Sequence, residues 1–240
     1  METLNDLVGY DNLKIYQNDD WFKFSLESVL LPNFVTINLS SKKILDLCSG
    51  NAPIPLILST RTNSKIIGVE YQKDIYDLAV KTVKINHLED QITMINEDVK
   101  RLNEYYEGDT FDLITVNPPY FKNQELSTKN VDIHKTIARH EINITLDDIL
   151  KTSSYLLKNG ARFAMVHRTE RFIEIINKLE KFNLIPKRIQ FIYPKEDKES
   201  NLFMIECLKN GQNEIKIEKP LFVHNNDGTY RDEIKKIFRI

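Results

Sequence analysis

An asparagine, two prolines and a tyrosine end an apolar stretch in the sequence FDLITVNPPYF, which runs from Phe111 to Phe121. Each proline biases the preceding residue toward extended conformations, so Asn117 and Pro118 are held out of a helix. Each proline also lacks an N–H group that could compete for nearby carbonyls. We expect a stiff turn that presents two acceptors toward one point, the Asn117 side-chain oxygen and the Pro118 carbonyl. Two convergent acceptors fit the two hydrogens of an –NH2 group.

The chemistry that this turn predicts is transfer to an amine nitrogen. An amine on a purine or in an amide is a poor nucleophile because its lone pair is delocalised. Binding both hydrogens favours a pyramidal nitrogen and aims its lone pair, while oriented dipoles stabilise the charge that develops. Asn117 is neutral, so it would position the amine and would not act as a base. Tyr120 would offer a π-face for a flat base, worth roughly 1–3 kcal/mol.

The candidate catalytic residues are therefore Asn117, Pro118, Pro119 and Tyr120. The alternative is a proline-rich turn with a structural role only. If the substrate is a nucleobase in a duplex or a folded loop, it must be unstacked to reach such a pocket.

A second candidate site follows another apolar stretch, in the sequence ILDLCSGNAPIPL. Asp46 lies at the end of this predicted strand, and Gly50 allows the backbone of the next turn to approach a ligand closely. The turn has neither the further glycines of a dinucleotide fingerprint nor the Gly-Lys-Ser/Thr of a phosphate loop. A glycine-poor turn led by an acid suits a ligand that carries an ammonium group and no pyrophosphate. S-adenosylmethionine is such a ligand.

Two further acids end the next two predicted strands. Glu70 is placed to accept hydrogen bonds from both ribose hydroxyls of this cofactor, and Asp98 from the amine of its adenine. The alternative is that these are solvated carboxylates at strand ends, most of all Asp98. The cofactor-binding residues predicted around the turns are Asp46, Cys48, Ser49, Gly50, Glu70, Tyr71, Asp98, Val99 and Asn117.

The elements that must position these residues alternate between strand and helix patterns. Strands are predicted in KKILDLCSG, SKIIGVE, QITMINEDV, FDLITVN and ARFAMVH. Helices are predicted in FSLESVLLPNFV, in DIYDLAVKTVKINHL, in LDDILKTSSYLLKNG with Gly160 as its stop, and from Thr169 to Lys181. This alternation predicts a mainly parallel α/β sheet, covered by helices on both faces. At the reversal of strand order, the Gly50 and Asn117 turns would share one crevice.

The last two predicted strands, RIQFIYP and LFMIECLK, are joined by the polar KEDKES without a helix. They should therefore form an antiparallel hairpin. The resulting Rossmann-like sheet of seven strands, mostly parallel with an antiparallel terminal hairpin, resembles that of class I methyltransferases.

Composition fits a folded globular chain of 240 residues, with 41% hydrophobic and 28% charged residues. Cys48 and Cys207 cannot make a disulfide framework, and no apolar run or leader pattern indicates a membrane or an export route. We expect a cytoplasmic protein without a membrane partner. The net charge of −2 neither indicates nor excludes a nucleic-acid partner. His134, His140 and His167 lack metal-ligand spacing, so we expect no metal and a structural or RNA-facing role for them.

The motifs resemble the bacterial tRNA1(Val) adenine-N6-methyltransferase family over nearly the whole chain. The resemblance is carried by FKFSLESVLLPNF, DLCSGNAPIPL, VEYQ, NEDV, NPPY, ARHE and HRTER. The sequence LCSGN differs from the commoner Gly-Thr/Cys-Gly form of this turn in the family, because Ser49 precedes a single glycine. The resemblance implies S-adenosylmethionine as the cofactor and tRNA as the partner. The implied reaction is methylation of the N6 amine of adenosine 37, beside the anticodon of valine tRNA.

The resemblance also implies one methyltransferase domain over residues 1–240. Residues 1–40 would cover the cofactor, with Phe24, Ser25 and Leu26 in contact with it. Residues 121–142 would be a mobile substrate loop, and 211–240 a C-terminal extension. The predicted RNA-binding residues are Lys122, Lys135, Arg139, His140, Arg168, Arg171, Lys187 and Arg188. They would contact phosphates without reading sequence, although a solvated loop is the alternative for 121–142. We expect a monomer or a weak dimer.

Three other functions remain open. A protein glutamine-N5-methyltransferase uses the same turn, but such enzymes usually carry a longer helical domain before the first strand. An rRNA or DNA amino-methyltransferase is a second alternative, and the DNA enzymes normally need a sizeable target-recognition domain that we do not find. A non-enzymatic cofactor-binding module would not require the Asn-Pro-Pro-Tyr sequence.

Overall fold

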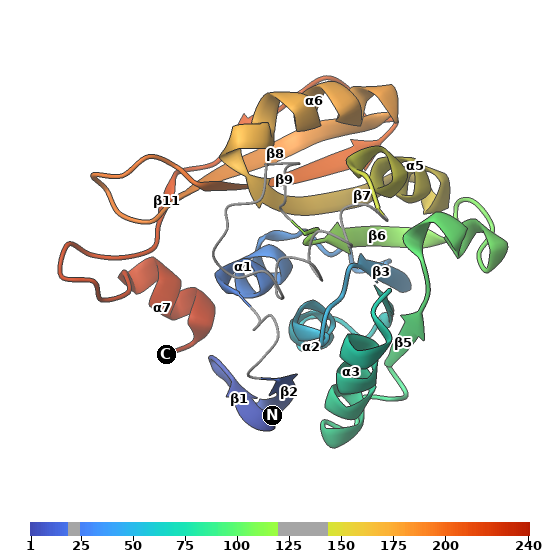
Figure 1. Cartoon of the computed structure of the whole chain (residues 1–240). Coiled ribbons are helices and arrows are strands. Elements are labelled where there is room, and N and C mark those ends of the chain that lie inside the picture. Colours follow the sequence, from blue (N-terminus) through green and yellow to red (C-terminus); the bar gives the residue numbers. More distant parts are fainter. Residues whose placement is uncertain (19–24, 120–143) are drawn as a thin grey trace, which may run out of the picture.

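A mixed β-sheet with helices on both faces forms the centre of the computed structural model (Figure 1), which describes residues 1–18, 25–119 and 144–240. The strands of this sheet are β3 (Lys43–Leu47), β4 (Lys65–Glu70), β5 (Ile92–Asn96), β6 (Phe111–Val116), β7 (Leu157–Arg168), β8 (Leu184–Tyr193), β9 (Leu202–Lys209), β10 (Lys216–Ile217) and β11 (Leu221–Phe222). The helices are α1 (Leu26–Phe34), α2 (Pro53–Ser59), α3 (Lys73–Ile85), α5 (Leu146–Leu156), α6 (Phe172–Lys181) and α7 (Asp232–Phe238), with 3-10 turns η1 (Val99–Glu104) and η2 (Thr169–Arg171). A separate hairpin consists of β1 (Glu2–Leu7) and β2 (Tyr10–Asn18).

The strand order confirms the predicted topology. It runs β10-β8-β9-β7-β6-β3-β4-β5, and β11 also pairs with β8. Pairs from β5 through β7 are parallel, whereas β9 is antiparallel to both β7 and β8. Because β3 lies between β4 and β6, the strand order reverses at β3, which is where such sheets bind their ligands.

Both faces of the sheet are buried, which explains why its central strands are apolar almost throughout. Side chains alternate between faces, so Ile44 of β3 packs on one side and Leu45 and Leu47 pack on the other. The first side carries α1, α2 and α3, and the second carries η1, α5 and α6, as Figure 1 shows. Asp46 and Thr115 are buried polar residues at positions that face α1 and α2.

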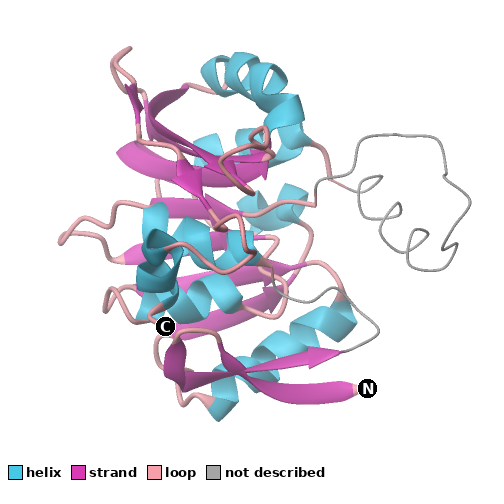
Figure 2. Cartoon of the chain, turned by 90° about the vertical axis from the view of Figure 1, so that its left-hand side faces the viewer, coloured by secondary structure: helices cyan, strands magenta, loops and turns pink. Residues whose placement is uncertain are grey.

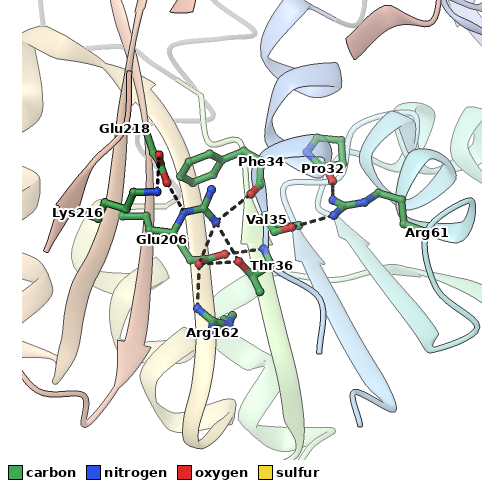
Figure 3. Close-up of polar contacts among 10 residues, drawn as sticks. Pro32, Phe34, Val35, Thr36, Arg61, Arg162, Glu206, Lys216 and Glu218 are labelled. Atoms are coloured by element: carbon green, nitrogen blue, oxygen red, sulfur yellow. Dashed lines mark hydrogen bonds and ion pairs between the residues drawn. The ribbon is translucent and has the colours of Figure 1, made fainter. Parts of the chain in front are cut away.

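Helix α1 is buried on almost every side and is anchored at its C-terminal end, as Figure 3 shows. The Arg61 guanidinium donates to the carbonyls of Pro32 and Val35, which satisfies orphan acceptors at the helix end. The fully buried Glu206 carboxylate accepts from the Thr36 backbone N–H at 2.6 Å. It also pairs with Arg162 at 2.8 Å. These bonds fix α1 against both α2 and the sheet.

The N-terminal hairpin and the C-terminal tail complete the layer that contains α1. Thr82 Oγ1 of α3 accepts from the Tyr16 backbone N–H at 3.0 Å. At Gly9, with φ +78°, an added β-carbon would overlap the Phe238 carbonyl, so only glycine permits this contact with α7. Figure 2, turned by 90°, shows the N-terminal hairpin at the lower end of the stacked strands.

Three parts of the fold differ from the sequence prediction. Helix α5 ends at Leu156, not at Gly160, because Leu156 and Leu157 are both fully buried and Leu157 turns extended to pair with Phe111. Gly160 has φ +73° and lies beyond the helix, inside the range of β7. The helix predicted from Thr169 begins with the 3-10 turn η2 before α6. The hairpin β1–β2 and the tail elements β10, β11 and α7 were not predicted.

Candidate active site

The two predicted turns lie side by side at the reversal of strand order. Val116 of β6 pairs in register with Leu47 of β3, so Asn117 and Cys48 leave the sheet from neighbouring positions. The turns lie close together because neighbouring parallel strands have their carboxyl ends at the same edge of the sheet. Both turns therefore lie at the edge where the topology predicts a shared crevice.

The turn after β3 has a left-handed backbone at alternate residues. Cys48, Gly50 and Ala52 have φ values of 55°, 57° and 72°. For residues with a β-carbon this conformation costs roughly 1–2 kcal/mol each, so the turn is strained at Cys48 and Ala52. A β-carbon added at Gly50 would meet no atom within 4 Å, so open space adjoins the backbone there. That space is where a ligand could approach the turn.

Asp46 supports this turn from beneath. Its side chain is fully buried, and its two carboxylate oxygens accept from Ser49 Oγ at 2.5 Å and Thr115 Oγ1 at 2.6 Å. Burial raises its pKa to about 7, against the opposing effect of these two hydrogen bonds. Both oxygens thus bind within the protein, and a contact of Asp46 with the cofactor stays a prediction.

Glu70 joins the first turn to the end of β4. Its carboxylate accepts from the Gly50 backbone N–H at 3.0 Å and from the Gln72 backbone N–H at 2.9 Å. Burial raises its pKa, and the backbone donors oppose this shift. The Tyr71 backbone N–H is a third donor to this carboxylate, which has about four lone-pair positions, so a further hydroxyl donor could still bind. Asn96 of β5 holds the same corner by donating to the Glu70 and Tyr71 carbonyls, each at 2.9 Å.

Asp98 lies one strand further along the edge and caps η1. Its side chain accepts from the Lys100 backbone N–H at 2.9 Å and pairs with the Lys100 ammonium at 3.3 Å. The pKa of the Cys48 thiol is raised by burial and then by the charges of Glu70, Asp46 and Asp98, so the three predicted acids surround one side chain. Their clustering, predicted from three successive strand ends, is what the structure has. Whether Asp98 binds adenine stays a prediction.

Asn117 contacts a helix that lies far away in sequence. Its Nδ2 donates to Ser28 Oγ of α1 at 3.3 Å, and Ser28 is only 5% exposed. Pro118 is buried and Pro119 is partly buried, so the turn packs against the protein on one side. The amide is thereby held at the edge of the sheet by the N-terminal part of α1.

The structure brings most predicted cofactor residues to this edge. At the ends of the strands and helices that meet there lie Ser25 and Leu26 at the start of α1, Cys48, Ser49 and Gly50 after β3, Glu70 and Tyr71 at and after the end of β4, Asp98 and Val99 after β5, and Asn117 after β6. The predicted residues Phe24, Tyr120, Lys122, Lys135, Arg139 and His140 lie outside the described residues, as does the segment 121–142.

The predicted RNA-binding residues do not form one group. Arg168 ends β7 at the ligand edge, and Arg171 follows in η2 with its guanidinium bonded to Glu174. Lys187 donates to the Gln212 carbonyl, and Arg188 donates to Glu218, to Thr36 Oγ1 and to the Phe34 carbonyl. Arg188 belongs to the ion pairs at the end of α1, and its contact with a phosphate stays a prediction.

His167 was expected to be structural or RNA-facing, and it is structural. It is 1% exposed, and burial lowers its pKa to about 4. Its Nδ1 accepts from the Arg168 backbone N–H at 2.8 Å.

Three residues that shape the site were missed from the sequence. Thr115 supports Asp46, Ser28 contacts Asn117, and Gly68 leaves room above β4 because an added β-carbon would lie 2.7 Å from Ser49 Oγ. The available signals were a glycine within the apolar SKIIGVE, which interrupts a strand pattern, and a polar hydroxyl at Thr115 within the otherwise apolar LITV. Ser28 had none, because its partner is 89 residues away.

Within the described ranges, we find no group of three or more His, Cys, Asp and Glu side chains suited to a metal ion. In the same part of the chain, none of the helices has both the length and the apolar character to span a bilayer.

Comparison with known proteins yields a family and a fold. The family model described as Conserved hypothetical protein 95 matches residues 27–190. A tRNA1(Val) (adenine(37)-N6)-methyltransferase of Aliivibrio salmonicida is 28% identical over 88% of this chain and 87% of its own length.

Two solved structures share the fold. The crystal structure of "a predicted O-methyltransferase" from Agrobacterium tumefaciens has a TM-score of 0.70 at 16% identity, covering 89% of this chain and 96% of that one. Geranyl diphosphate C-methyltransferase from Streptomyces coelicolor, in complex with Mg2+, geranyl diphosphate and S-adenosyl-L-homocysteine, has a TM-score of 0.58 at 11% identity and covers 76% of each chain. The chain therefore has the class I methyltransferase fold predicted from its strand pattern.

Proposed function

The chain belongs to the family described as Conserved hypothetical protein 95, and on that premise we propose that it is an S-adenosylmethionine-dependent tRNA (adenine-N6)-methyltransferase. The substrate would be adenosine 37 of valine tRNA, as in the name of the Aliivibrio salmonicida relative. The observation that carries the proposal is the position of Asn117 beside the Gly50 turn. Asn117 would accept hydrogen bonds from the substrate amine, and the Gly50 turn would bind the cofactor. Because the two lie at neighbouring strand ends, the methyl group could pass directly from the bound cofactor to the bound amine.

The residues at the edge fit S-adenosylmethionine. The open space beside Gly50 admits a ligand against the backbone, and the Glu70 carboxylate, which accepts from three backbone N–H groups, has acceptor capacity left for the ribose. Asp46 acts from below by holding Ser49 and, through it, the turn. When bound, the cofactor supplies an electrophilic methyl group on a sulfonium. Asp98 and Val99 would contact the adenine, while Tyr71, Ser25, Leu26 and Phe24 would enclose the cofactor.

Asn117 would hold the substrate amine. Its side-chain oxygen and the Pro118 carbonyl would accept the two hydrogens, which pyramidalises the nitrogen and directs its lone pair. The Nδ2 group of the amide donates to Ser28 Oγ. Tyr120 would stack on the base, and Pro119 would keep the turn stiff. The nitrogen would lose its proton after transfer, because Asn117 cannot accept one.

The tRNA would lie across the carboxyl edge of the sheet. Arg168 at the end of β7 and Arg171 in η2 are at this edge and would contact phosphates. Lys187, and the residues Lys122, Lys135, Arg139 and His140 of the 121–142 loop, are further proposed contacts. The reaction needs no metal in this scheme, and the enzyme would act in the cytoplasm as a monomer or a weak dimer within a single domain.

The test is methyl transfer from isotopically labelled cofactor to unmodified valine tRNA transcript. The expected product is N6-methyladenosine at position 37, located by nuclease digestion and mass spectrometry. A transcript with guanosine at position 37 is the matched control and should stay unlabelled.

Parallel reactions with rRNA, DNA and a release-factor protein address the alternatives. Label in the glutamine of the protein, or in rRNA or DNA but not in tRNA, would replace the proposed substrate. Absence of label in every substrate, with cofactor bound, would overturn the proposal of a methyltransferase.

A further inference from the structure

Strand β2 pairs with β1 along one edge, and side chains from elsewhere bind the backbone of its other edge. Asn86, which follows α3, accepts from the Lys14 N–H at 2.8 Å and donates to the Lys14 carbonyl at 2.7 Å. Thr82 Oγ1 accepts from the Tyr16 N–H at 3.0 Å, and Asn51 Nδ2 donates to the Tyr16 carbonyl at 2.7 Å. These side chains take the place of a neighbouring strand and hold the hairpin against the domain.

Asn51 differs from the other two side chains because it belongs to the turn after β3. It lies between Gly50 and Ala52, and it is 8% exposed. A backbone carbonyl only accepts hydrogen bonds, so the bond to Tyr16 can come only from the nitrogen end of the Asn51 amide. Loss of this bond would leave a buried polar group without its partner, which costs more than the loss of a surface contact.

The turn needs support because its backbone is strained. Cys48 and Ala52 both have left-handed φ values, and such a conformation persists only where the surroundings enforce it. On one side of the turn, the Gly50 N–H donates to Glu70 at 3.0 Å. On the other, Asn51 donates to the hairpin. Consecutive residues thus tie the turn to β4 and to β2, which lies beside α2 and α3 (Figure 1).

We propose that Asn51 is a positioning residue for cofactor binding, which holds the strained turn in its binding shape by donating to the Tyr16 carbonyl of the N-terminal hairpin. This inference rests on the proposed binding of S-adenosylmethionine at this turn. Asn51 contacts neither the cofactor nor the tRNA in this scheme. The hairpin, which no sequence motif predicts, is thereby part of the scaffold of the cofactor site.

The first test is Asn51→Ala in the full-length enzyme. We expect the Kd for S-adenosylmethionine to rise about tenfold, because binding must then also order the turn. The kcat at saturating cofactor and the KM for tRNA should change less than about threefold, since the bound cofactor restores the shape of the turn.

The matched control is Asn86→Ala. It removes two bonds to the same strand, but Asn86 lies outside the turn. Both variants should lower the midpoint of urea denaturation, whereas the control should keep the cofactor Kd within about twofold of the wild type. This comparison separates support of the turn from general stability.

A second test uses the reciprocity of coupled sites. If the bond to the strand favours cofactor binding, the bound cofactor must favour the bond by the same factor. Exchange of the Lys14 and Tyr16 backbone N–H groups, followed by NMR, should therefore slow about tenfold on saturation with cofactor in the wild type. At equal occupancy, the slowing should be less than about twofold in Asn51→Ala. The Arg231 N–H, which donates to the Val223 carbonyl, is the internal control for general stabilisation by the ligand.

Several outcomes would overturn the inference. An unchanged Kd for Asn51→Ala would show that the turn does not need this bond. An equal rise in Kd for Asn86→Ala would assign the effect to docking of the hairpin as a whole. Equal slowing of exchange in the wild type and in Asn51→Ala would show that Asn51 does not carry the coupling.

If Asn51→Ala does not fold, exchange in the wild type decides the question, because Lys14 and Tyr16 amides that cofactor does not slow contradict the coupling. Failure of the proposed function is distinct, because then the wild-type protein would not bind S-adenosylmethionine at all.

Discussion

The Gly50 backbone N–H donates to the Glu70 carboxylate at 3.0 Å, which joins the ends of two adjacent strands through one side chain. The second oxygen of Glu70 accepts from the Gln72 backbone N–H at 2.9 Å. One acid thus fixes both the backbone that would approach the cofactor and the turn that follows β4. The same carboxylate is proposed to accept the ribose hydroxyls, so the shape of the site and its affinity depend on one group.

Glu70→Gln should therefore lose cofactor affinity. A glutamine places –NH2 against one of the two backbone N–H groups and removes the charge that strengthens every bond to the carboxylate. We expect the Kd for S-adenosylmethionine, measured by isothermal titration calorimetry, to rise about 10–100-fold. Glu104→Gln is the control, because Glu104 pairs with Arg101 on the surface. An unchanged Kd for Glu70→Gln would show that Glu70 does not bind the cofactor.

The contribution of Asp46 to the free energy of unfolding should fall as the pH rises. Its pKa in the folded protein is raised from 3.8 to about 7 by burial, so between these values the folded protein holds a proton that the unfolded chain has lost. The stability from this group is fully present below a pH of about 4 and is lost as the pH rises through about 7. Asp46→Asn stays neutral throughout, and its amide can still bond to Ser49 and Thr115.

Thermal unfolding of both proteins across pH measures this difference. The free energy of unfolding of the wild type should fall relative to that of Asp46→Asn between a pH of about 4 and a pH of about 7, and the difference should stay constant above that. Comparing the two proteins at each pH cancels the other titrating groups, such as His167. A wild type that gains stability over the variant as the pH rises would contradict the raised pKa.

A larger side chain at position 68 should disturb the turn after β3 by steric contact with Ser49. Gly68 pairs in register with Asp46, and an added β-carbon would lie 2.6 Å from Met94 Sδ and 2.7 Å from Ser49 Oγ. Gly68→Ala should push the Ser49 hydroxyl away from Asp46, which lowers the free energy of unfolding by about 1–3 kcal/mol and weakens cofactor binding.

Chemical denaturation and cofactor titration test the Gly68 variant. Gly108→Ala is the control, because it precedes β6 at the opposite edge and its added β-carbon would meet only Tyr155, at 3.2 Å. If Gly68 acts through Ser49, Ser49→Ala should weaken cofactor binding in the wild type but add little in the Gly68→Ala protein. Additive effects of the two substitutions would refute that route.

The strand pattern carried most of the fold. The five apolar runs before the hairpin and the paired RIQFIYP and LFMIECLK became β3 through β9 in the predicted order. Hydrophobic runs report burial on both faces, and a polar connection without a helix requires an antiparallel pair, so both inferences follow from local sequence. The hairpin of β1 and β2 was not predicted. Most residues of β1 are exposed, so its sequence lacks the apolar residues of a buried strand face.

The site was predictable where its residues follow strands directly. Gly50, Glu70 and Asn117 met because parallel strands end at one edge. Ser28, Gly68 and Thr115 could not be assigned their roles, because each acts on a residue that only tertiary packing brings near. The ion pairs of Arg188 could not be predicted for the same reason, since a basic residue in sequence gives no sign of the buried Glu206 opposite it.

The central claim is that the Asn117 amide grips the amine that receives the methyl group. Its most direct test is single-turnover methylation of valine tRNA by Asn117→Ala, with cofactor Kd measured on the same preparation. We expect the rate of transfer to fall at least about a thousandfold, since a preorganised acceptor is removed, while the Kd changes less than about threefold. A rate near that of the wild type would contradict the claim, as would a loss of cofactor binding large enough to explain the lost rate.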